Sequence, residues 1–70
     1  MNIVEKMELE NNLKTNLANW MICHGEVLEY RVGHNQYVEL TWAQVLWKNQ
    51  IYNIIGVDGL VCRIEKTNKI

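Results

Sequence analysis

The run Val38–Trp47, VELTWAQVLW, constrains the fold more than any other part of the chain. Its first half alternates apolar and polar residues, as a strand with one buried face does. Thr41 then stands in an N-cap position, and Gln44 follows three residues later, as a capping box requires. The rest of the run is almost continuously apolar. We therefore predict a strand that ends near Trp42 and a short helix from there to about Asn49.

A β-hairpin is predicted immediately before that helix. Two stretches of period-2 alternation flank a short loop that contains glycine and asparagine. This pattern is typical of two antiparallel strands with one face on the core and the other in water. The apolar residues expected to share the buried face are Leu28, Tyr30, Val32, Val38, Leu40 and Trp42.

A second hairpin is predicted around Asp58-Gly59, the preferred sequence for a two-residue type I′ turn. Residues 60–66 alternate after the turn. Residues 51–57 before it are rich in β-branched and aromatic side chains, which favour strands. The alternative is that 51–57 prolongs the short helix.

The N-terminal segment Ile3–Cys23 is predicted to be a helix that Gly25 ends. Apolar residues at spacings of four, four and three define the face expected to pack on the core. These residues are Leu9, Leu13, Leu17 and Trp20. Because asparagine is a poor helix former, an alternative start lies at Asn11 or Asn12.

These elements predict an α+β fold in which an N-terminal helix packs on a small antiparallel sheet of two β-hairpins linked by a short helix. We expect residues 1–70 to form a single compact domain. The strand order is left open. Two cysteines, no secretory signal and no apolar run of membrane-spanning length predict a cytoplasmic protein with reduced thiols and no membrane association.

Few residues are candidates for chemistry. Cys23, His24, His34 and Cys62 have the right identity for metal ligands, but they lack the paired close spacing of a zinc site. The chain contains no serine, which excludes a serine triad. A chain of 70 residues also has little room for a substrate pocket. We predict no enzymatic activity, no metal and no cofactor.

The charge pattern argues against nonspecific nucleic-acid binding, because the formal net charge is only −1. Residues 1–40 are acidic and the remainder is basic, so we expect a dipolar surface. The alternative function is a small nucleic-acid-binding regulator that uses sheet aromatics and C-terminal basic residues. The residues of that alternative are Tyr30, Tyr37, Tyr52, Lys48, Arg63, Lys66 and Lys69.

Three tryptophans in 70 residues favour an interaction surface. Trp42 and Trp47 are five residues apart and cannot share one face of a short helix, so we expect Trp47 to be an exposed anchor. The alternative is that all three tryptophans complete the core. The candidate protein-binding residues are Trp47, Trp42, Tyr37, Glu29 and Glu39.

The predicted function is a small non-catalytic protein-binding module that modulates or inhibits a cellular protein. Residues read by AT-rich codons (Asn, Ile and Lys) fill 21 of 70 positions. This composition favours a phage or mobile-element product that acts on a host protein. Homo-oligomerisation through the tryptophan surface remains an alternative, because a self-complementary patch has the same sequence signature.

Overall fold

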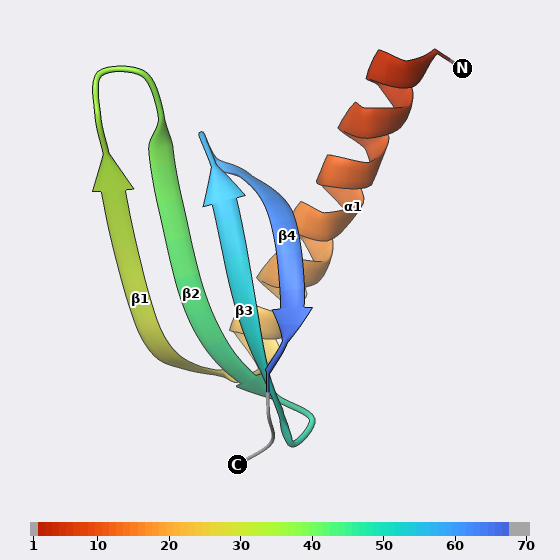
Figure 1. Ribbon diagram of the computed structural model, residues 1–70. Helices are drawn as coiled ribbons and strands as arrows, with labels where there is room; N and C mark the ends of the chain where they lie inside the picture. The colour runs from red at the N-terminus through yellow and green to blue at the C-terminus, as the bar shows by residue number, and fades with distance from the viewer. Residues whose placement is uncertain (1, 68–70) are drawn as a thin grey trace.

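The computed structural model describes residues 2–67, without the side chains of residue 4 and residues 7–11. The elements are, in order, α1 (Ile3–His24), β1 (Glu26–His34), β2 (Glu39–Trp47), β3 (Gln50–Val57) and β4 (Leu60–Lys66). The strands form one antiparallel sheet in the order β1-β2-β3-β4. Helix α1 packs mainly beside β4, and β1 forms the far edge (Figure 1). The predicted α+β class is confirmed.

The helix has the cap at each end that its sequence provides. Asn2 Oδ1 accepts a hydrogen bond from the Glu5 amide at 2.9 Å, and the Gly25 amide donates to Met21 O at 2.7 Å. The predicted helix over Ile3–Cys23 is therefore confirmed, and the alternative start near residue 11 is wrong. Gly25 is required for space, since a Cβ there would lie 2.5 Å from Leu46 O.

The predicted short helix after Trp42 is wrong, because residues 39–47 form the single strand β2. Lys48 and Asn49 then make a two-residue turn with φ angles of 50° and 61°, as a type I′ hairpin requires. The run is almost continuously apolar because β2 lies inside the sheet and carries apolar side chains on both faces. A run of this kind cannot be distinguished from a buried helix by periodicity.

The second predicted hairpin is confirmed. Strands β3 and β4 pair on either side of Asp58-Gly59, whose φ angles are 51° and 84°. Residues 51–57 therefore belong to a strand, and the alternative helical extension is wrong. Asp58 also joins this turn to β2, because its carboxylate accepts from the Glu39 amide at 2.8 Å.

We expect Gly59→Ala to lower the free energy of unfolding by about 1–2 kcal/mol, because its φ of 84° is strained for a residue with a Cβ. Gly33→Ala is the matched control, since no heavy atom lies within 4 Å of the position its Cβ would take. Chemical denaturation followed by circular dichroism measures both. Equal losses would contradict the strain argument.

The core lies between α1 and the two central strands. Its buried residues are Ala18, Met21, Ala43, Val45 and Ile54. Trp47, Tyr52, Val61 and Ile64 pack around them, each partly buried. The predicted core face of α1 is wrong: Leu13, Leu17 and Trp20 are exposed by 59%, 45% and 56%. The side chain of Leu9 lies outside the described residues.

The predicted shared face of the first hairpin is also wrong. Tyr30 pairs with Ala43 on the helix side of the sheet, whereas Trp42 pairs with Arg31 on the other side. The reason is the loop, which places four residues between the paired His34 and Glu39. From Glu29 to His34, even-numbered residues of β1 therefore face odd-numbered residues of β2. The loop is fixed by Asn35 Oδ1, which accepts from the amides at positions 37 and 38.

Candidate protein-binding face

The sheet face turned away from α1, which we call the open face, carries an apolar strip along its centre. The strip consists of three directly opposed cross-strand pairs of β2 and β3. The pairs are Leu40–Val57, Trp42–Ile55 and Leu46–Ile51. Gln44 and Asn53 interrupt the strip, and the Gln44 amide donates to Asn53 Oδ1 at 3.5 Å. No described element covers these side chains, which are half-buried by one another except for Leu40, which is 51% exposed.

Two ion pairs border the strip on the outer strands. On β1, Arg31 Nε donates to Glu29 Oε1 at 2.9 Å, and on β4 Arg63 pairs with Glu65. The Arg31 guanidinium also lies 5.6 Å from the centroid of the Trp42 ring. An apolar centre within a charged rim is the common anatomy of a protein–protein interface.

The five predicted binding residues do not form one surface. Trp42 and Glu29 both lie on the open face, on neighbouring strands. Glu39 and Trp47 lie on the helix side of the sheet at opposite ends of β2. Tyr37 lies in the β1–β2 loop, where it is 79% exposed.

Trp47 is not the exposed anchor that we predicted. It is half-buried against the core, with its ring centroid 6.1 Å from that of Tyr52 and 4.6 Å from Lys48 Nζ. The most exposed tryptophan is Trp20 on α1, whose ring stacks on His24 at 3.9 Å. The prediction failed because it placed Trp47 on a helix, whereas in β2 it shares a face with buried Ala43 and Val45.

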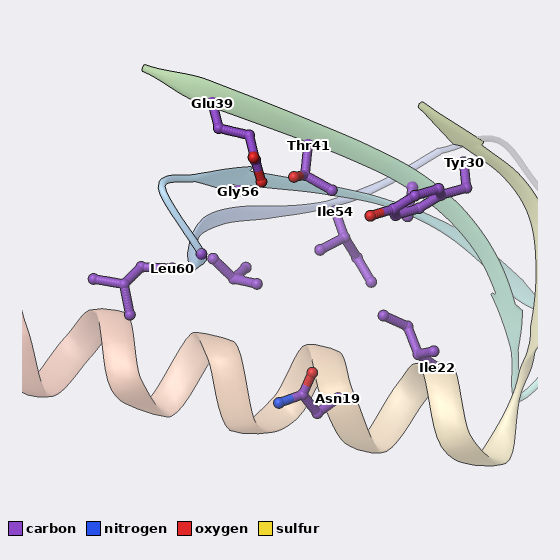
Figure 2. A pocket seen from close by; sticks show the side chains of 11 residues that line it. Asn19, Ile22, Tyr30, Glu39, Thr41, Ile54, Gly56 and Leu60 are labelled. Carbon is purple, nitrogen blue, oxygen red and sulfur yellow. The ribbon is translucent and has the colours of Figure 1, made fainter. Parts of the chain in front are cut away.

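A second feature is a groove of about 280 Å³ between α1 and the helix side of the sheet (Figure 2). Ile22 points into it from α1, and Ile54 and Tyr30 point into it from the sheet. Among the described residues that line it, the only ionisable side chains are Glu39 and Tyr30. Among the described lining residues no histidine, cysteine, lysine or serine accompanies them.

The residues with metal-ligand identity are dispersed. Cys23 and His24 end α1, His34 ends β1, and Cys62 lies in β4. His24 Nδ1 is hydrogen-bonded to Trp20 O at 2.9 Å, and the Cys62 thiol donates to Ile55 O at 3.4 Å. Within residues 2–67 no three His, Cys, Asp or Glu side chains gather into a group that could hold a metal ion.

Helix α1 is long, but it is not a membrane span. Within the described part of the chain, no helix combines the length and the continuous apolar character that crossing a bilayer demands.

The comparisons with known proteins add no relative to this description. No family model, curated protein or solved structure matched the chain. The description of the candidate site therefore depends on the geometry of the chain itself.

Proposed function

We propose that this protein is a small non-catalytic binding module that modulates another protein by covering part of its surface with the open face. The observation that carries the proposal is the apolar strip on β2 and β3, bordered by the Glu29–Arg31 and Arg63–Glu65 ion pairs. An apolar patch with a polar border is typical of a docking surface.

Trp42 is the proposed anchor of the contact. It stands near the centre of the strip, opposite Ile55 on β3 and beside Arg31 on β1. Tryptophan and arginine are the side chains most enriched among residues that dominate binding energy. Glu29 has a supporting role, because it neutralises Arg31 and holds the guanidinium near the indole ring.

The nucleic-acid alternative has less support. Arg31 and Arg63 lie on the open face, and each is paired with a glutamate. Tyr30 and Tyr52 lie on the helix side of the sheet, away from these cations. Binding of a single strand needs aromatic rings and free cations along one groove. Lys69, which also belongs to that alternative, lies outside the described residues.

The test is to compare Trp42→Thr with Trp20→Ala. Threonine keeps the strand preference at position 42, and Trp20 is exposed on α1, away from the open face. A partner captured by the wild-type protein from nuclease-treated lysate of the source cell is purified and titrated against both variants. We expect Trp42→Thr to weaken binding about thirtyfold, as loss of an anchor does, and Trp20→Ala to bind like the wild type.

Circular dichroism establishes that both variants are folded. Equal binding by Trp42→Thr and the wild type would contradict the open face as the contact. Loss of every partner after nuclease treatment, with binding that falls steeply as salt rises, would instead support the nucleic-acid alternative.

A further inference from the structure

The two edge strands of the sheet, β1 and β4, differ in whether another element supplies hydrogen-bond partners for their outward-facing backbone groups. At the β4 edge, α1 supplies partners: Thr15 Oγ1 accepts from the Val61 amide at 2.9 Å, and Lys14 Nζ donates to Cys62 O at 3.2 Å. Covering an edge with a helix is a common protection against unwanted strand pairing. The β4 edge is therefore protected.

The β1 edge has no such cover among the described residues. All nine residues of β1 are exposed, and the strand pairs only with β2. It stands at the side of the sheet away from the helix (Figure 1). An uncovered strand of this length is a template for a further strand.

The sequence of β1 identifies which strand fits. When two copies of β1 lie antiparallel with Tyr30 of one opposite Tyr30 of the other, their side chains are complementary. In that register Glu29 faces Arg31 of a second copy, and Leu28 faces Val32. Opposite charges and apolar pairs across antiparallel strands are stabilising.

Neighbouring registers lose this complementarity. A two-fold axis through Arg31 would place this cation against its own copy, and an axis through Glu29 would do the same to the carboxylate. Like charges directly opposite one another are destabilising. The charges of β1 therefore favour the register in which Tyr30 of one copy lies opposite Tyr30 of the other.

We propose that β1 pairs antiparallel with β1 of a second copy of this chain, about a two-fold axis at Tyr30. The product is a dimer with a continuous eight-stranded sheet. Leu28 is the extra residue of a β-bulge between Val27 and Glu29, so the regular part of the proposed ladder covers residues 29–31 of each copy, with Leu28 and Val32 at its two ends. The dimer uses the backbone edge of β1 but shares Glu29 and Arg31 with the border of the open face. Its test therefore measures self-association of the purified protein, which is read separately from binding of a partner.

The first test is a charge exchange read by analytical ultracentrifugation over a concentration series. The wild type is expected to reach twice the monomer mass of 8.3 kDa. Glu29→Arg and Arg31→Glu each place like charges across the two-fold axis, and each is expected to raise the dimer dissociation constant about tenfold or more. A mixture of the two variants is expected to form a mixed dimer, because the cations of one then face the carboxylates of the other.

Arg63→Glu is the matched control. It breaks the equivalent i,i+2 ion pair on the same sheet face, but on the β4 strand that α1 covers, so it is expected to dimerise like the wild type. A wild type that stays monomeric over the whole series overturns the proposal. So does a dimer that Arg63→Glu weakens as much as Arg31→Glu, or one that responds only to Trp20→Ala on α1.

The second test fixes the register by disulfide trapping, with Cys23 and Cys62 replaced by serine. Tyr30→Cys places a thiol on the two-fold axis, where opposed Cα atoms lie about 4.5–5.5 Å apart, within disulfide range. Val32→Cys is the control, because the two thiols are then offset by four residues, or about 13 Å. Oxidation is expected to cross-link only Tyr30→Cys. Cross-linking of Val32→Cys alone would overturn the register.

Discussion

Met21→Ala is expected to lower the free energy of unfolding by about 2–5 kcal/mol, which is the usual cost of truncating a fully buried methionine. Met21 is 1% exposed and is, with Val45, one of the two largest fully buried side chains among the described residues. Among the described residues the fully buried part of the core consists of five side chains, so Met21 contributes a large share of its volume. Urea denaturation followed by tryptophan fluorescence and circular dichroism measures the loss.

Leu17→Ala is the matched control on the same helix. Leucine and methionine have similar sizes, but Leu17 is 45% exposed, whereas Met21 is 1% exposed. We expect its removal to cost less than about 1 kcal/mol, because little apolar area returns to water. A larger loss for Leu17→Ala than for Met21→Ala would reverse the assignment of the core face.

Gly25→Ala is expected to cost at least about 3 kcal/mol, at the upper end of overpacking effects. A Cβ at this position would lie 2.5 Å from Leu46 O and 2.7 Å from Met21 O. Both atoms are backbone, so neither can move without disturbing β2 or the last turn of α1. The loss would unfold a large fraction of so small a domain.

The Gly25→Ala measurement is a thermal melt, with Gly33→Ala as the control in open space. We expect a large fall in the melting temperature for the first variant and almost no change for the second. A melting temperature for Gly25→Ala within a degree or two of the wild type would show that α1 can separate from β2 at this junction.

Local chemistry predicted the parts of the fold that depend on neighbouring residues. The helix over Ile3–Cys23 and the turn at Asp58-Gly59 are both confirmed, because they depend on helical spacing and on turn geometry. The capping pattern at Thr41 led to the wrong prediction of a short helix, because Thr and Gln at this spacing cap a helix only where a helix forms. In β2, Thr41 faces Gly56 across the sheet instead.

The candidate site was predicted in part. Tryptophan content directed attention to Trp42, which does lie in the apolar strip of the open face. It also directed attention to Trp47, which packs against the core. The strip itself was missed, because the run over residues 51–57 gave no sign of which side chains face α1.

The sequence alone determined the element types at both ends of the chain, the positions of the turns that carry Asp58-Gly59 and Gly25, and the charge pattern of β1. Those features depend on interactions a few residues long. Only the tertiary structure decided which side of α1 and which side of each strand became the core. Apolar residues occur on two sides of the helix and on both faces of β2, so burial on either side would satisfy the sequence pattern. Small residues such as Ala18 and Ala43 lie in the core where α1 packs on the sheet. The four-residue loop sets the register of β1 against β2 and so determines which side chains of β1 face α1.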